Sequence, residues 1–152
     1  MSICILTDKS ALFPTALSGT DGHIFTFPLA STNEKLRETT IAEFHRLFFE
    51  LETRFDALLI LTASEKILPG ARTAWQAAQT HGGSLKISVL DTQQIGAGVG
   101  LLAQLGARTS VSETSLPKVE ERLRAAIPHI YTLLCPEFTP AGAPEEPGNF
   151  PI

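Results

Sequence analysis

The sequence is poor in cysteine, in charge of either sign and in long apolar runs. Only Cys4 and Cys135 occur among 152 residues, and each lies in a short apolar stretch. We expect buried free thiols at both positions, because a disulfide framework needs more cysteines and a secretory signal, which we do not find. No apolar stretch is long enough to span a bilayer, so we expect a cytoplasmic protein with no membrane span.

Side chains for metal binding, nucleic-acid binding and catalysis are also sparse. The 12 lysines and arginines are scattered along a chain of net charge −4, which argues against a nucleic-acid partner. The four histidines, His23, His45, His81 and His129, show no metal-ligand spacing with cysteine or acidic residues. No nucleophile stands at a recognisable spacing from a base. We therefore expect a protein that is not an enzyme and that carries no cofactor and no metal.

What the sequence does have is a globular composition, with 43% hydrophobic and 18% charged residues. A chain of this length is sufficient for one domain with a core. From residue 136 on, the composition changes, because five of the last 17 residues are proline. We expect one α/β domain over residues 1–135 and an extended, Pro-rich tail over residues 136–152.

Short apolar runs predict strands, and helical periodicity predicts the helices between them. The predicted strands cover residues 3–7, 24–29, 55–63, 86–90 and 130–135. The predicted helices cover residues 41–53, 71–79, 94–107 and 115–126. This alternation indicates an α/β fold: a single-domain, mostly parallel sheet of about five strands with helices on both faces. Pro28 places the second strand at an edge, and the uniformly apolar third strand is expected to be central.

Local signals refine the remaining segments. Thr40 followed by Glu43 is a capping-box pattern at the start of the first predicted helix. Residues 30–38 lack periodicity and are expected to form a loop. Trp75, the single tryptophan, is expected on the buried side of its helix.

The loop between the third strand and the second helix is the expected ligand site. Apolar residues Leu58–Leu61 run into small polar residues, and a loop with Pro69-Gly70 then opens a helix. Open parallel sheets bind ligands outside the carboxyl ends of their strands. Polar and small residues at other strand ends and helix starts are expected to face the same cleft: Asp8, Ser10, Thr39, Thr40, Ser64, Gly70 and Asp91.

Four glycines, at positions 96, 98, 100 and 106, fall within the helix predicted over residues 94–107. Each weakens a helix by about 1 kcal/mol relative to alanine, so this density needs a physical reason. Close packing of the helix and close approach of a ligand tail both supply one, and the sequence leaves both open. The spacing does not match a dinucleotide-binding fingerprint, which also lies at the start of a helix and not inside it.

Five motifs, in the same order, resemble those of the DegV family. The stretch from Ile5 to Pro14 resembles the family's opening strand, which runs into Asp-Ser and then Asp-Leu-Pro. Phe27-Pro28-Leu29 resembles its Val-Pro-Leu, and Leu68-Pro69-Gly70-Ala71 resembles its Leu-Ser-Gly-Thr loop. Asp91-Thr92 falls where the family has Asp-Ser, and the stretch from Gln94 to Leu101 is similar to its Ser-x-Gly-x-Gly-Leu helix. The resemblance covers most of the expected domain.

The resemblance implies the fold of the DegV amino-terminal domain and a long-chain fatty acid as ligand. It also implies a separate partner, a kinase that phosphorylates the carboxylate of the bound acid. In the family, hydroxyls of a Thr-Ser loop and of the Leu-Ser-Gly-Thr loop hold that carboxylate, and Thr39 or Thr40 falls near the first of these. The resulting candidates for fatty-acid binding are Asp8, Ser10, Thr39, Thr40, Ser64, Pro69, Gly70, Arg72 and Gly98.

The chain departs from the family pattern in its loop and in its length. Pro69 and Ala71 stand where the family has Ser and Thr, so two hydroxyls are missing. Arg72, as a cation, and Ser64, as a hydroxyl, are the residues expected to compensate. The resemblance stops where the Pro-rich stretch begins, so we expect the family's carboxyl-terminal domain to be absent. Fatty-acid binding would then require a homo-oligomer or a separate chain that supplies the missing half.

Two other hypotheses remain at this point. The chain could be an interaction or structural protein that kept the fold and lost fatty-acid binding, as the missing hydroxyls suggest. It could also be an enzyme acting on a small anionic substrate with Asp8, Asp91 and Arg72, although no catalytic spacing supports this.

Overall fold

The computed structural model describes residues 2–13, 23–27, 30–32, 35–37, 39–68 and 70–133. Its main sheet has four strands in the order β2-β1-β5-β6, and every neighbouring pair is parallel. The strands are β1 (Ile3–Asp8), β2 (Ile24–Phe27), β5 (Ala57–Thr62) and β6 (Lys86–Asp91). The expected central position of β5 and the expected edge position of β2 are therefore confirmed. Every residue of β1 and β5 is buried, which explains why both strands are apolar until the polar residues at their carboxyl ends.

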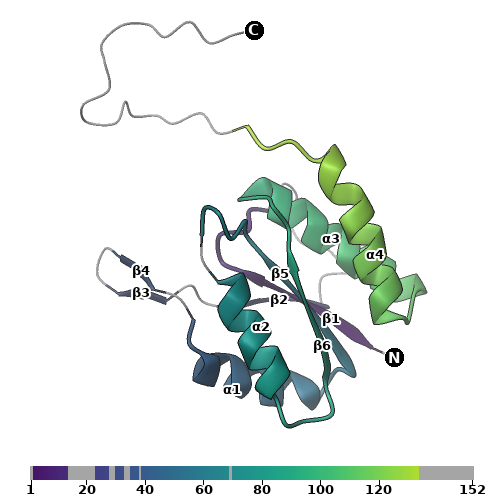
Figure 1. Cartoon of the computed structure of the whole chain (residues 1–152). Helices are drawn as coiled ribbons and strands as arrows, with labels where there is room; N and C mark the ends of the chain where they lie inside the picture. Colours follow the sequence, from purple (N-terminus) through teal and green to yellow (C-terminus); the bar gives the residue numbers. More distant parts are fainter. Residues whose placement is uncertain are drawn as a thin grey trace, which may run out of the picture.

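Two pairs of helices cover the two faces of this sheet (Figure 1). Side chains alternate between the faces, so that Ile3 and Ile5 of β1 pack on one side, while Cys4 and Leu6 pack on the other. The first face is covered by α3 and α4, and the second by α1 and α2. The helices are α1 (Ile41–Glu52), α2 (Ala71–Thr80), α3 (Ala97–Ser112) and α4 (Leu116–Ala126). This confirms the predicted α/β class with helices on both faces.

The start of α1 has the capping box that the sequence pattern predicted. Thr40 caps the helix as a capping box, because its hydroxyl oxygen accepts a hydrogen bond from the Glu43 amide while the Glu43 carboxylate accepts one from the Thr40 amide. The apolar residues Phe44, Phe48 and Leu51 then fill the core beneath the helix. Such a cap stabilises a helix by about 1 kcal/mol.

Within the described residues, the sheet has four parallel strands and not the five expected, because the predicted strand over residues 130–135 does not form at residues 130–133. After α4, a 3₁₀ turn (Ile127–His129) redirects the chain. Gln94 then fixes this segment: its Nε2 donates to the Ile130 carbonyl oxygen, at 3.2 Å, and its Oε1 accepts from the Thr132 hydroxyl, also at 3.2 Å. These bonds hold the segment beside the carboxyl ends of the strands, away from the edge of the sheet. Residues 134 and 135 lie outside the described part of the chain.

Three other expectations were wrong in detail. Residues expected to form a loop contain a small antiparallel hairpin, β3 (Ala30–Thr32) and β4 (Lys35–Arg37). Trp75 is 53% exposed, because the buried face of α2 consists of the small residues Ala74 and Ala77. The third concerns α3, which begins three residues later and ends five residues later than expected.

The cysteine expectation is confirmed for the residue that the structure describes. Cys4 is a free thiol with no exposed surface. Burial raises its pKa to about 12, because a thiolate would be poorly solvated in this core. Within the described residues, no helix has the length and apolarity needed to cross a membrane, and no group of three or more His, Cys, Asp or Glu side chains is placed to hold a metal ion.

Candidate functional site

The carboxyl ends of β1, β5 and β6 lie at one edge of the sheet, because all its strands are parallel (Figure 1). The loops that follow these strands are tied together by hydrogen bonds, and we call them the carboxyl rim: residues 8–13, 63–68 and 91–96. The Ala63 amide donates to Asp8 Oδ2 at 3.1 Å, which joins the second loop to the first. The Ser64 amide donates to the Gln94 carbonyl oxygen at 2.8 Å, which joins it to the third. The rim is therefore one connected structure.

Asp8 is the main brace of this rim. Its side chain is almost fully buried, with 4% of the residue exposed. Oδ1 accepts hydrogen bonds from the Ser10 amide, at 2.8 Å, and from the Ser10 hydroxyl, while Oδ2 accepts from Ala63. Three donors compensate for the burial of the carboxylate. The structure thus brings the predicted residues Asp8, Ser10 and Ser64 together, with Asp8 and Ser10 engaged mainly with one another.

Two buried hydroxyls at the rim lack a hydrogen-bond partner among the described residues. These are Oγ1 of Thr7 and Oγ1 of Thr62, both on residues with 1% exposure or less. Thr62 is the last residue of β5 and pairs with Asp91 in register, so both side chains lie on the face covered by α2. Sequence reasoning missed both threonines, because a threonine at the end of an apolar strand is an ordinary strand residue.

Glu65 occupies the amino terminus of α2. Its Oε2 accepts from the Gly70 amide at 3.0 Å and from the Ala71 amide at 2.8 Å. A helix amino terminus has unpaired N–H groups and a positive dipole end, so it favours a carboxylate. The predicted loop therefore does hold a carboxylate, but the carboxylate is supplied by the protein. The signal available in the sequence was an acidic residue a few positions ahead of a helix that has no capping side chain of its own.

The other predicted site residues have separate surroundings. Arg72 is exposed in the first turn of α2, and Pro69 lies outside the described residues. Thr40 is committed to the cap of α1. Thr39 is 7% exposed and lines a small cavity of about 90 Å³ together with Phe27, Glu43, Arg46, Leu47 and Glu50.

Close packing accounts for the glycines of α3. A Cβ atom at Gly100 would lie 2.0 Å from the Leu12 carbonyl oxygen, so the first rim loop can cross the helix only over a glycine. A Cβ atom at Gly98 would lie 2.7 Å from the Thr132 hydroxyl and 2.8 Å from Gln94 Oε1. Gly98 therefore lies at the rim, beside the segment that follows α4. Gly96 has a φ of 53° and accepts a hydrogen bond from the Leu12 amide through its carbonyl oxygen.

Exposed apolar side chains surround the polar rim. Leu12 is 63% exposed on the first loop, Ile67 is 59% exposed on the second, and Leu101 is 44% exposed in α3 beside the crossing point. Tyr131 and Leu133, on the segment held by Gln94, are 87% and 91% exposed. We call these five residues the apolar collar. Open α/β domains form a class in which ligands are generally bound outside the carboxyl ends of the strands, so the polar rim and the apolar collar together are the candidate site of this chain.

Comparison with protein families identifies that class more closely. Residues 29–138 match the family described as "Uncharacterised protein, DegV family". Because this match covers more than half of the 152 residues, the chain belongs to the DegV family. No curated protein matches the sequence.

Solved structures of low sequence identity share the fold. A fatty-acid-binding DegV family protein from Thermus thermophilus has 22% identity and a TM-score of 0.69, with 84% of this chain and 54% of that chain covered. A DegV lipid-binding protein from Thermotoga maritima has 18% identity and a TM-score of 0.72, with 85% and 55% covered. The Fatty Acid Kinase B3 protein from Streptococcus pneumoniae, loaded with linoleic acid, has 15% identity and a TM-score of 0.58, with 84% and 55% covered. The chain thus spans about half the length of these proteins.

Proposed function

We propose that this protein binds a long-chain fatty acid at its carboxyl rim, as one half of a site that another domain or chain completes. The observation that carries the proposal is the apolar collar, because Leu12, Ile67 and Leu101 are exposed around a rim of buried polar groups. Exposed apolar side chains gathered at one end of a domain indicate a binding surface. Three solved relatives of the same fold are described as binding fatty acid or lipid, which supports this chemistry for the collar.

The backbone of the α2 loop supports recognition of the carboxylate. Although Pro69 and Ala71 replace the hydroxyl residues of the family, the Gly70 and Ala71 amides remain as donors and bind the carboxylate of Glu65. A fatty-acid carboxylate would take these two amides once Glu65 has moved away. Further candidates are Ser64 and the Thr62 hydroxyl, which is buried and without a partner among the described residues.

The acyl tail is the reason to expect a partner. Each CH₂ group removed from water contributes about 0.8 kcal/mol, so an open rim leaves much of the affinity unused. Leu101 leads into a shallow groove of about 340 Å³ that is also lined by Leu105, Ala126 and Ile130. We propose that the tail lies over the collar and this groove, and that a second domain or chain covers it. A kinase that phosphorylates the carboxylate is the further partner that the S. pneumoniae relative suggests.

A second candidate function is suggested by the hydrogen bonds that the rim already makes within the protein. Glu65 already accepts hydrogen bonds from the α2 amides, and the buried Asp8 carboxylate accepts one from the Ala63 amide, so these rim donors are occupied with no bound anion. These contacts favour a protein that uses the apolar collar only for contact with another protein. The two candidates differ in whether a lipid is bound.

Mass spectrometry of the purified protein tests the proposal. The native spectrum gives the mass of the assembly, and the extract of denatured protein identifies any bound lipid. A stoichiometric fatty acid in the extract, or saturable uptake of added oleate or palmitate, is the expected result. Protein that carries no lipid and does not take up either acid would contradict lipid binding and favour the protein-contact candidate.

A further inference from the structure

The groove between α3 and the segment that follows α4 combines an apolar lining with positive charge. It has a volume of about 340 Å³. Its lining includes Leu101, Leu105 and Ile130, together with the exposed residues Arg108 and His129. None of the described residues that line it is acidic. A hydrocarbon tail would cover the apolar part but would leave the guanidinium without a counter-charge, so the groove is better suited to an anionic ligand with apolar groups.

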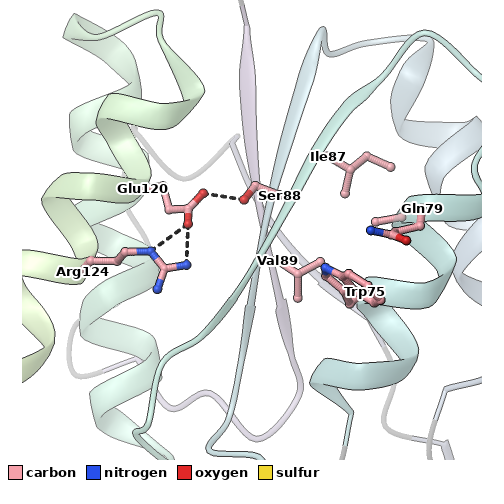
Figure 2. Close-up of a pocket in the computed structure, with 8 residues that line it drawn as sticks. Trp75, Gln79, Ile87, Ser88, Val89, Glu120 and Arg124 are labelled. Atoms are coloured by element: carbon pink, nitrogen blue, oxygen red, sulfur yellow. Dashed lines mark hydrogen bonds and ion pairs between the residues drawn. The ribbon is translucent and has the colours of Figure 1, made fainter.

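Arg108 has no ion pair within the described part of the chain. A groove of about 420 Å³ beside β6 also holds an arginine, but its charge is already neutralised (Figure 2). There Glu120 binds Arg124 at 2.6 Å and also accepts a hydrogen bond from the Ser88 hydroxyl. Of these two arginines, Arg108 is therefore the one that remains open to a further carboxylate.

The Pro-rich tail, residues 136–152, has the complementary chemistry. It contains three glutamates and no lysine, arginine or histidine. It also contains Phe138 and Phe150, which supply large apolar side chains. Proline-rich sequences favour the extended polyproline II conformation, which binds in apolar grooves with little loss of conformational entropy. The family match ends at residue 138, so most of the tail lies beyond the matched region.

The tail begins close to the groove. Ile130 is part of the groove lining, and hydrogen bonds from Gln94 to the Ile130 carbonyl oxygen and from the Thr132 hydroxyl to Gln94 fix the path of the chain beyond it. Pro136 follows Leu133, the last described residue, by three positions, which span at most about 10 Å. A segment tethered by a short linker has an effective concentration of roughly millimolar, so even a weak contact within the chain is populated.

We propose that the Pro-rich tail of the same chain occupies this groove, with its phenylalanines on the apolar lining and its glutamates beside Arg108 and His129. The contact itself does not depend on lipid binding. Its consequence for the lipid site rests on the proposed function: an acyl tail needs the same groove, so the two exclude one another. The docked tail then lowers the apparent affinity for a fatty acid by the fraction of chains in which the groove is open.

Paramagnetic relaxation enhancement, measured by NMR on the full chain, tests the proposal. A nitroxide is attached at Asn149→Cys in a Cys135→Ser background, where the buried Cys4 stays unlabelled. Amide signals of residues 101–108 are expected to lose much more intensity than those of α1, which lies on the other face of the sheet. Equal loss on both faces, or none at the groove, would overturn the proposal. So would the same loss when one chain carries the nitroxide and another the isotope, because the tail of a second copy would then fill the groove.

A charge reversal tests whether the contact is specific. Arg108→Glu is expected to lower the ratio of docked to undocked chains about fivefold, because repulsion replaces an exposed ion pair. Arg46→Glu, at an exposed arginine of α1, changes the net charge equally and is expected to leave docking unchanged. Adding Glu137→Lys, Glu145→Lys and Glu146→Lys to the Arg108→Glu protein is expected to restore docking. Equal signal loss in the Arg108→Glu and Arg46→Glu proteins would contradict the proposed contact.

Titration of oleate measures the consequence for the lipid site. The combined Glu137→Gln, Glu145→Gln and Glu146→Gln protein keeps the groove intact but weakens docking. It is expected to bind oleate more tightly than the wild-type protein, by up to the inverse of the fraction of wild-type chains whose groove is open. Equal oleate affinity of the two proteins would refute the competition. Docking seen with the nitroxide, together with no oleate uptake by either protein, would support the docked tail and contradict the proposed fatty-acid function.

Discussion

Replacing Glu65 separates its role in the fold from its role at the proposed ligand site. The Glu65 carboxylate makes two charge-assisted hydrogen bonds, to the Gly70 and Ala71 amides, at 3.0 and 2.8 Å. Loss of a capping side chain costs about 1 kcal/mol, and loss of a negative charge at a helix amino terminus costs about 0.3–1 kcal/mol. We therefore expect Glu65→Ala to lower the free energy of unfolding by about 1–2 kcal/mol. Glu65→Gln keeps an acceptor oxygen and is expected to lose about half as much.

The same substitution has the opposite expected effect on fatty-acid binding. If Glu65 competes with the ligand carboxylate for the α2 amides, the site is open only part of the time, and the apparent affinity is reduced by that fraction. A competing contact of about 1 kcal/mol lowers the affinity about fivefold, so Glu65→Ala is expected to bind oleate about fivefold more tightly while unfolding more easily. The specific expectation is thus that Glu65→Ala lowers the stability of the protein and raises its affinity for oleate.

Urea unfolding followed by circular dichroism, together with titration of oleate, measures both quantities. Glu121→Ala, at an exposed glutamate of α4, is the control and is expected to change neither. Equal stability of the Glu65→Ala and Glu121→Ala proteins would refute the capping role. Weaker oleate binding by a folded Glu65→Ala protein would refute the competition.

Three further predictions concern a glycine of α3, the buried cysteine of β1 and the glutamate at the end of α1. Gly100→Ala is expected to cost about 1–3 kcal/mol, because its Cβ atom would overlap the facing backbone carbonyl oxygen, whereas Gly82→Ala meets nothing within 4 Å and is expected to be neutral in thermal unfolding. Cys4 is expected to resist alkylation at about pH 8 until the protein unfolds, since burial raises its pKa to about 12; labelling is measured with the other cysteine replaced by serine, and rapid labelling of the folded protein would contradict this. Hydrogen bonds from the Ser84 hydroxyl and amide lower the pKa of Glu52, so its contribution to stability is present above the unfolded-state pKa and is lost as the pH falls through the folded-state pKa. Glu52→Gln is therefore expected to weaken the dependence of the free energy of unfolding on pH between about pH 5 and pH 3. If the variant loses as much stability on acidification as the wild-type protein, Glu52 does not make this contribution.

The parts of the fold that sequence reasoning predicted are those set by local pattern and burial. The uniformly apolar runs of β1 and β5 could only be buried strands, and the Thr40–Glu43 pattern fixed the start of α1. The edge position of β2 followed from Pro28, and the central position of β5 followed from its apolarity. These signals act over a few residues, so a sequence displays them directly.

The sequence-based predictions were wrong where contacts between residues distant in the sequence determine the structure. The apolar stretch after α4 has a strand-like composition, but hydrogen bonds from Gln94, on another loop, hold it beside the rim. Trp75 is next to Ala74 in sequence, and only the close approach of α2 to the sheet shows that the small side chain takes the buried position. The Glu65 contact depends on how a five-residue loop folds back on a helix. Periodicity carries no information about such contacts.

At the candidate site, the sequence predicted where the polar residues lie better than it predicted what they do. Asp8, Ser10 and Ser64 do gather at the carboxyl ends of the strands, as parallel topology requires. Their hydrogen bonds, however, mostly hold the loops to one another. The distinction between a residue that builds a rim and a residue that contacts a ligand depends on which polar atoms remain without a partner, and only coordinates reveal that.

The path of the chain beside Gln94 has a practical consequence for handling the protein. Residues 130–133 leave the domain at the carboxyl rim, whereas β1 begins at the opposite end of the sheet, about 20 Å away for a six-residue strand. A label, affinity tag or surface tether placed ahead of β1 leaves the rim open to solution. The same attachment placed directly after residue 133 would emerge over the collar and obstruct it, so immobilised or fluorescent forms intended for ligand assays should carry their modification ahead of β1.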